Sequence, residues 1–145
     1  MKRMIVGVLA LGLGACAGAP QGDSIPIHDF DPSFSSAMCA SAGWDRAKLD
    51  DLKAAKFEIA DNEARQAFAK AITACLASPD PELRDKIAFE ALTHMLRGRQ
   101  LSAPTQKALM ADLVARLDAP AGQGFEQPFA ALALSEVTEA ILSPA

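Results

Sequence analysis

The residues best suited to chemistry lie in one stretch, 78–96, which reads SPDPELRDKIAFEALTHML. Within it, Glu90 and His94 are four residues apart, so on a helix they are close enough to interact. A carboxylate beside an imidazole can form an acid/base pair. With Glu136 or His28 as a further ligand, the same pair could hold a metal ion for hydrolysis. A metal-assisted hydrolase is therefore one hypothesis for this chain.

The same residues also have a structural interpretation, which the pattern favours. One histidine and one carboxylate fall short of the three protein ligands of a catalytic metal site. Arg84 is expected to be buried and paired with Asp80 or with an acid on the next helix, and His94 to be a hydrogen-bonded histidine at the core edge, with Glu136 as a candidate partner. No serine lies in a nucleophile elbow, and no phosphate loop follows a strand. We expect no catalytic residue, no metal and no cofactor.

The stretch is predicted to be the central helix of the fold. Asp80 is placed as its N-cap and Pro81 at its first position, where the missing N–H costs nothing. Gly98 is expected to stop the helix just beyond its last turn. Its apolar residues cover half the circumference, so it must pack on more than one side. They are Leu83, Ile87, Ala88, Ala91, Leu92 and Met95.

Four more helices are predicted around this one. They span about 45–56, 62–76, 103–117 and 128–142, with Asp45, Asp61 and Ser102 as N-caps of the first three. No segment alternates between apolar and polar residues as a half-buried strand does, so no sheet is expected. The prediction is an all-α fold of about five helices in antiparallel HEAT-like hairpins, forming a right-handed solenoid or bundle.

The N-terminus is interpreted as a targeting sequence. Two basic residues precede an apolar run, 4–13, that is too short to span a membrane. The sequence Leu13-Gly14-Ala15-Cys16 then resembles the lipobox of bacterial lipoproteins. The resemblance implies cleavage before Cys16 and acylation of that residue, including palmitate on the thiol. The alternative is an ordinary secretory signal in which Cys16 is incidental.

These features divide the chain into a signal peptide at 1–15, a lipid-anchored tether at 16–43 and one helical domain at 44–145. The tether is interrupted by glycine and proline, which break any periodic pattern. The resemblance implies a bacterial cell envelope protein, anchored in the membrane and facing the periplasm. Ala17 and Gly18, in place of an acid after the cysteine, suggest the outer membrane. The formal charge of −4 argues against nucleic acid as a partner, because phosphate binding needs a basic face.

The cysteine count allows at most one disulfide. Besides Cys16 there are Cys39 and Cys75, without CxxC spacing. Cys75 lies on the apolar stripe of the predicted helix 62–76, where a thiol can be a small buried hydrophobe. Export to the periplasm would equally permit a disulfide between Cys39 and Cys75. The sequence leaves both alternatives open.

Two runs, DPELRDKIAFEAL and GFEQPFAALALSEV, resemble a bacterial domain family of unknown function. The resemblance implies a HEAT-like helical fold and no known activity. It also implies structural roles for Asp80, Pro81, Arg84, Asp85 and Phe129. The family's usual C-terminal histidine-rich segment is absent from this sequence, as expected of a shortened relative, a truncated product or a binding-only derivative. We therefore expect a lipid-anchored protein that binds a protein or peptide, or a structural envelope component.

Overall fold

The computed structural model describes residues 44–119 and 124–143. Within these ranges the regular structure is helical and there is no strand, so the all-α prediction is confirmed. The five helices are α2 (Arg46–Ala54), α3 (Asn62–Ile72), a central helix, α6 (Ala103–Asp118) and α7 (Glu126–Leu142). A 3-10 turn, η1 (Thr73–Ala77), extends α3. The central helix joins α4 (Pro81–Leu83), the π-helical turn η2 (Arg84–Phe89) and α5 (Glu90–Arg97).

The N-terminal predictions fall on residues outside this part of the chain. The signal peptide, the tether, Cys16, His28 and Cys39 all lie in 1–43 and outside the described residues. Among the described helices, none has both the length and the apolar character needed to cross a membrane.

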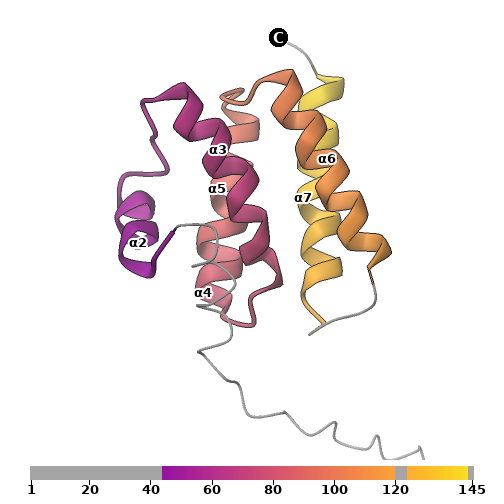
Figure 1. Ribbon diagram of the computed structural model, residues 1–145, viewed down its shortest axis with the longest axis horizontal. Coiled ribbons are helices and arrows are strands. Elements are labelled where there is room, and N and C mark those ends of the chain that lie inside the picture. The colour runs from indigo at the N-terminus through magenta and orange to yellow at the C-terminus, as the bar shows by residue number, and fades with distance from the viewer. Residues whose placement is uncertain (1–43, 120–123, 144–145) are drawn as a thin grey trace, which may run out of the picture.

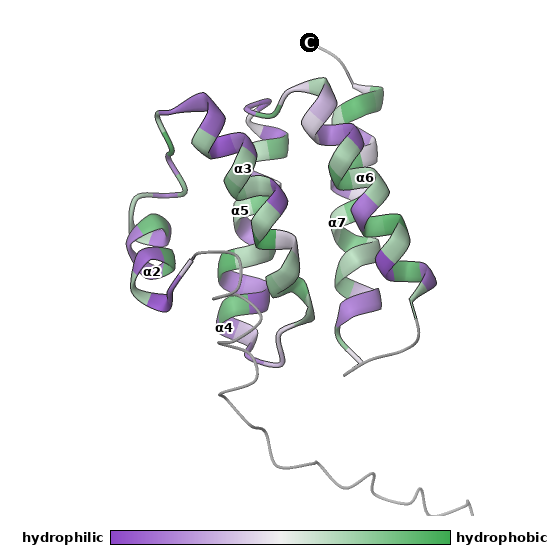
Figure 2. Cartoon of the chain, in the orientation of Figure 1, coloured by the Kyte–Doolittle hydropathy of each residue, from purple (hydrophilic) through white to green (hydrophobic). Residues whose placement is uncertain are grey.

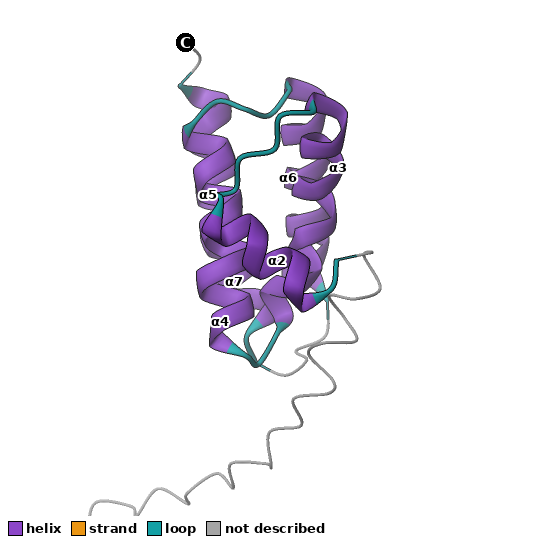
Figure 3. Ribbon diagram, turned by 90° about the vertical axis from the view of Figure 1, so that its left-hand side faces the viewer, coloured by secondary structure: helices purple, strands orange, loops and turns teal. Residues whose placement is uncertain are grey.

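The helices form two antiparallel hairpins that stand side by side (Figure 1). One hairpin is α3 with the central helix, and the other is α6 with α7. Seen from the side, α3 and α6 form one layer, and the central helix and α7 form the other (Figure 3). The contacts agree, because α3 packs on α6 and α5 packs on α7. Helix α2 lies beside the first hairpin. Both a bundle and a stack of HEAT-like hairpins have this layering, so the HEAT-like arrangement stays a prediction.

The predicted N-caps are confirmed at the start of four helices. Asp45, Asp61 and Asp80 each accept a backbone N–H of the first turn, at 2.9, 2.6 and 2.9 Å. Ser102 does the same for α6 at 3.4 Å. The backbone hydrogen bond from Lys48 is the main cause that lowers the pKa of Asp45. Because each cap satisfies an N–H that the helix leaves unpaired, these residues fix where the helices begin.

The end of the central helix differs from the prediction at Gly98. This glycine has an ordinary helical φ of −72°, and the left-handed residue is the next one, Arg99, with φ +54°. The Arg99 N–H donates to the Leu96 carbonyl at 3.0 Å, which closes the helix end. Gly98 is needed for another reason. A Cβ there would lie 2.9 Å from the carbonyl oxygen of His94, a contact that is too close.

The central helix contains a π-helical turn that we did not predict. Its buried residues come in adjacent pairs every four positions: Leu83 and Arg84, Ile87 and Ala88, Ala91 and Leu92, Met95 and Leu96. Four residues of a regular α-helix advance about 40° beyond a full turn, so this stripe would drift around the helix. A π turn is wider, since its hydrogen bonds span five residues. It takes up part of that drift and keeps the pairs facing the core.

The core lies between the two layers of helices. Its largest fully buried side chains come from both layers. They include Phe68, Ile72 and Leu76 from α3 and the turn after it, Ile87, Leu92 and Met95 from the central helix, and Leu109, Leu113 and Val137 from α6 and α7. Trp44 packs edge-on against Phe68, with ring centroids 4.6 Å apart. The first described residue is therefore already part of the packed domain.

Candidate functional site

Arg84 is buried near the start of the central helix, where it faces the second hairpin. It is 8% exposed, and its guanidinium lies over two rings of the second hairpin, 4.2 Å from Phe125 and 4.7 Å from Phe129. Its Nε donates to Asp85 Oδ1 at 2.7 Å, and its Nη1 donates to the Ser78 carbonyl at 3.2 Å. The charge is thus paired, hydrogen-bonded and covered by aromatic faces. These contacts agree with the structural role expected for Arg84, Asp85 and Phe129.

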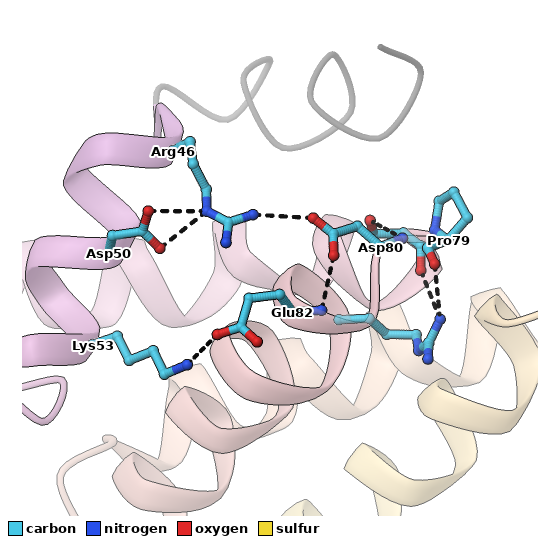
Figure 4. A network of polar contacts seen from close by, with 8 residues as sticks. Arg46, Asp50, Lys53, Pro79, Asp80 and Glu82 are labelled. Atoms are coloured by element: carbon cyan, nitrogen blue, oxygen red, sulfur yellow. Dashed lines mark hydrogen bonds and ion pairs between the residues drawn. The ribbon is translucent and has the colours of Figure 1, made fainter. Parts of the chain in front are cut away.

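Arg84 was predicted to pair with Asp80 or with an acid on the next helix, and both alternatives are wrong, because its acidic partner is Asp85. As the N-cap, the Asp80 carboxylate faces the first N–H groups of its own helix, and its other oxygen accepts Arg46 Nη1 at 3.0 Å. Figure 4 shows this network, in which Arg46 also binds Asp50. A second ion pair joins Lys53 of α2 to Glu82. Asp80 therefore helps to hold α2 against the start of the central helix.

Glu136 also has a partner other than the one expected. Its two carboxylate oxygens accept Arg97 Nη2 and Nε at 2.6 and 2.8 Å. These hydrogen bonds raise the pKa of Arg97. Glu136 is 12% exposed and joins α7 to the end of α5. The structure places it with Arg97 and away from the contacts of Arg84 and His94, so it belongs to the inter-helix packing.

Glu90 and His94 lie one turn apart on α5, as predicted, but each contacts a different group. Glu90 pairs with Lys86 at 3.6 Å. His94 Nε2 lies 3.6 Å from Glu58 and 3.4 Å from the side-chain amide of Gln100. Among the described residues, no group of three or more His, Cys, Asp or Glu side chains is arranged to hold a metal ion.

The two residues do line an open cleft, which we call the α2–α5 cleft. It encloses about 510 Å³, a volume within the usual range of small-molecule sites. The end of α2 and the turn after it provide Lys53, Lys56 and Phe57. The central helix provides Phe89, Glu90, Thr93 and His94. The sequence prediction contained only Glu90 and His94 of this set.

One wall of the α2–α5 cleft has a strained backbone. Lys56 and Phe57 both have left-handed φ angles, +53° and +59°. Their N–H groups donate to Lys53 and Leu52 and close the end of α2, at 2.9 and 2.8 Å. A left-handed conformation costs a residue other than glycine about 1–2 kcal/mol. Strain of this kind persists where surrounding structure enforces it, and it clusters at ligand sites.

Thr93, in the other wall, has a hydroxyl oxygen that is unsatisfied but shielded from the cleft. Thr93 Oγ1 is fully buried and has no hydrogen-bond partner within the described residues. Most buried hydroxyls are hydrogen-bonded, because a lost hydrogen bond costs about 1–3 kcal/mol. Neither this atom nor the strain at Phe57 has a sequence signature. A threonine at a helical position gives no sign of whether its hydroxyl is satisfied.

A second hollow, the α6–α7 groove, is a shallow and open depression on the other hairpin, with a volume of about 630 Å³. Its walls are Leu117 from α6 and, from α7, Ala131, Leu134, Ser135, Thr138, Glu139, Leu142 and the adjacent Ser143. Helix α7 is apolar around much of its circumference (Figure 2). Its buried side is occupied by Ala130, Ala133 and Val137. The groove therefore covers a different face of α7, on which Leu142 is 75% exposed.

Cys75 is buried, with 1% of its surface exposed, and is disulfide-bonded. The possible partner named from the sequence, Cys39, lies outside the described residues. The Cys39–Cys75 pairing therefore stays a prediction, and Cys75 is not a free thiol for catalysis.

Comparison with known proteins adds no assignment to these sites. No family model, no curated protein and no solved structure matches this chain. The resemblance to a bacterial domain family stays a prediction. The function has to be argued from the cleft, the groove and the N-terminal sequence.

Proposed function

We propose that this chain is a lipid-anchored protein of the bacterial cell envelope that faces the periplasm and binds a partner protein. The anchor is Cys16, by its lipobox-like context, and the outer membrane is the proposed location. The binding surface is the α6–α7 groove, and its occupant is an amphipathic helix of the partner. The observation that carries this proposal is the exposed apolar face of α7.

The shape of the α6–α7 groove suits a helix. Along α7 its lining residues recur at positions 131, 134, 135, 138 and 142, which are the spacings of one helical face. From position 131 to position 142 the helix rises by eleven steps, or about 16 Å, the length of three turns. Amphipathic helices bind in such grooves through apolar side chains at similar spacings. Exposed apolar surface of this kind marks interaction sites.

The charge on α7 favours a different protein over a second copy of this chain. The helix carries three glutamates and no lysine, arginine or histidine. Glu126 and Glu136 are paired with Arg116 and Arg97, which leaves Glu139 as the charged residue of the groove. Two α7 helices packed together would place like charges in contact, which is unfavourable. A partner helix with a lysine or arginine beside its apolar face would complement Glu139.

The hydrolase hypothesis gains no support from the described residues. It needs ligands that are free to bind a metal, whereas Glu90 faces Lys86 and Glu136 is held by Arg97. The hypothesis would rest on His94 and on residues outside the described ranges. We therefore propose binding alone.

The anchor is tested by Cys16→Ser. The variant should lose metabolic labelling by a fatty-acid probe and should move from the membrane fraction to the periplasmic fraction, because the thiol that carries the first acyl chain is gone. Cys39→Ser is the matched control and should keep both the label and the membrane fraction. Acyl labelling that survives in Cys16→Ser would refute the anchor.

The α6–α7 groove is tested with a photo-crosslinking amino acid placed at Ser135 in the membrane-anchored protein. We expect a heteromeric adduct whose crosslinked peptide is an amphipathic helix with a basic residue. Ala131→Lys combined with Leu142→Lys should abolish this adduct, since two charges would enter an apolar groove. Mass spectrometry of the adduct is the measurement.

The controls use exposed residues outside the groove. The pair Val114→Lys and Leu132→Lys changes two other exposed apolar residues and should leave the adduct intact. The crosslinker placed at Ala115 of α6 should not give the heteromeric adduct. An adduct with a second copy of the chain, or the same adducts from Ser135 and Ala115, would contradict the proposal.

A further inference from the structure

The α6–α7 groove leads, at the end of α7, to a pocket lined by basic residues. We propose that the partner segment bound in the groove continues into this pocket and places an acidic side chain between Arg99 and Lys107. The inference rests on the proposed function, since it concerns the same partner, and it adds a second charge to that partner's pattern. A basic residue opposite Glu139 would be followed, toward the end of α7, by an aspartate or a glutamate.

Two further hollows connect the groove to the turn between α5 and α6. The first has a volume of about 150 Å³ and shares Glu139 and Ser143 with the groove. The second, which we call the basic pocket, has a volume of about 290 Å³ and shares Leu96, Arg99 and Ala140 with the first. Its other lining residues are Ala103, Gln106, Lys107 and Ile141. The three hollows therefore follow one another around the end of α7, which lies beside the turn from α5 to α6 (Figure 1).

The charge of the lining residues changes sign along this path. Glu139 is the charged residue of the groove. In the first hollow, Arg97 and Glu136 are paired with each other. The basic pocket is lined by Arg99 and Lys107 and by no aspartate or glutamate. Within the part of the chain that the structure describes, neither of these two cations is in an ion pair. Two cations in one pocket without an acid attract a carboxylate of the partner.

Arg99 is held at the place where the groove ends. Its backbone is left-handed, with φ +54°, and its Nη1 donates to the Ser143 carbonyl at 2.6 Å. That hydrogen bond places the guanidinium at the end of α7. A guanidinium has five N–H donors, and it often binds a carboxylate through two of them at once. Because the fold already holds Arg99, this side chain loses less conformational freedom when a carboxylate binds.

The walls of the basic pocket are largely apolar. Leu96 is 1% exposed, and Ala140 and Ile141 are half-buried. An ion pair on open surface contributes little, because water screens the charges, whereas a carboxylate beside apolar walls is partly shielded. The groove also holds the rest of the segment close by, so the acidic residue is present at a high effective concentration. The basic pocket therefore adds specificity for a charge to a segment that is bound mainly by apolar contacts.

A photo-crosslinking amino acid placed at Ala103 in the membrane-anchored protein tests the inference. Ala103 is exposed and lines the basic pocket. It should capture the same partner as the crosslinker at Ser135, through a peptide that is adjacent to the groove peptide in the partner's sequence and contains an aspartate or a glutamate. The crosslinker at Ala47, an exposed alanine of α2, is the matched control and should not capture this partner. Mass spectrometry of the adducts is the measurement.

Substitutions of the two cations locate the acidic contact. Lys107→Glu should lower the yield of the Ser135 and Ala103 adducts at least about tenfold, because an attraction becomes a repulsion. Arg99→Asn, which keeps a residue that tolerates the left-handed backbone, should lower both yields as well. Replacement of the captured acidic residue of the partner by lysine should restore the adducts of Lys107→Glu. Lys70→Glu makes the same charge change on an exposed residue of α3 and should leave both adducts intact.

The outcomes separate this inference from the proposed function. If the Ser135 adduct forms but Ala103 captures nothing, or if Lys107→Glu and Arg99→Asn leave both adducts unchanged, the acidic contact is refuted while the groove stands. If neither position captures a partner, both proposals fail. A peptide without an acidic residue at Ala103, or a second copy of this chain in that adduct, would also overturn the inference. The urea midpoint of Lys107→Glu should equal that of the wild type, since the residue is exposed.

Discussion

Arg84→Ala should lower the free energy of unfolding by about 3 kcal/mol, through the loss of a buried, paired charge and the packing around it. The guanidinium lies over Phe125 and Phe129, and each cation–π contact of this kind is worth about 0.5–2 kcal/mol. Its removal also leaves the Ser78 carbonyl without this donor. Urea denaturation followed by circular dichroism measures the change.

Two variants separate the contributions. Arg84→Lys keeps the charge but loses the planar fork, so most of the loss should remain. Asp85→Asn should cost much less, since the Asp85 side chain is 39% exposed and solvent can replace the partner. If Arg84→Lys were as stable as the wild type, the charge alone would suffice and the planar contacts with Phe125 and Phe129 would not matter.

Ile87→Ala should cost a similar amount, about 3–4 kcal/mol, for a different reason. Ile87 is 0% exposed and lies in the π turn, between the two layers of helices. Truncation removes apolar contacts and leaves a cavity that the packed neighbours fill only in part. The thermal midpoint should fall by roughly 4–8 °C for each kcal/mol lost from a domain of this size.

Leu142→Ala is the matched control for this truncation. Leu142 is 75% exposed, so the same change from a large to a small aliphatic side chain should alter stability by less than about 0.5 kcal/mol. Calorimetry of the two variants in the same buffer gives the comparison. Equal losses of stability in Ile87→Ala and Leu142→Ala would contradict both the burial of Ile87 and the exposure of Leu142.

The helix starts could be predicted from the sequence because each depends on a single local contact. Asp45, Asp61, Asp80 and Ser102 accept N–H groups two or three residues ahead, and such short-range chemistry is visible in the letters. The apolar stripes likewise predicted five helices and no strand. The end of the central helix after Arg97 was predicted correctly, but glycine was expected to be the left-handed residue there because of its general preference for that conformation. In the structure Arg99 adopts the left-handed conformation instead.

The sites were harder to predict because they depend on how elements approach one another. Glu90 and His94 were correctly placed on one helix face, but their surroundings come from the turn after α2. Phe57 reaches the cleft through a left-handed backbone that a phenylalanine does not normally adopt. Asp80 was expected as one possible partner of Arg84 because the stretch resembles HEAT-type repeats, in which the aspartate and the arginine pair. Its role as an N-cap competes with that pairing and prevails.

The π turn has a consequence for how this chain tolerates insertions and deletions. A π turn is equivalent to one extra residue in an α-helix. If the exposed Lys86 were deleted, the buried pairs before and after it would be three residues apart instead of four. Residues three apart also lie on the same side of a regular α-helix. A deletion elsewhere in the helix would turn everything beyond it by about 100°. The π turn is thus the position where the length of the central helix can vary by one residue while both halves keep their neighbours.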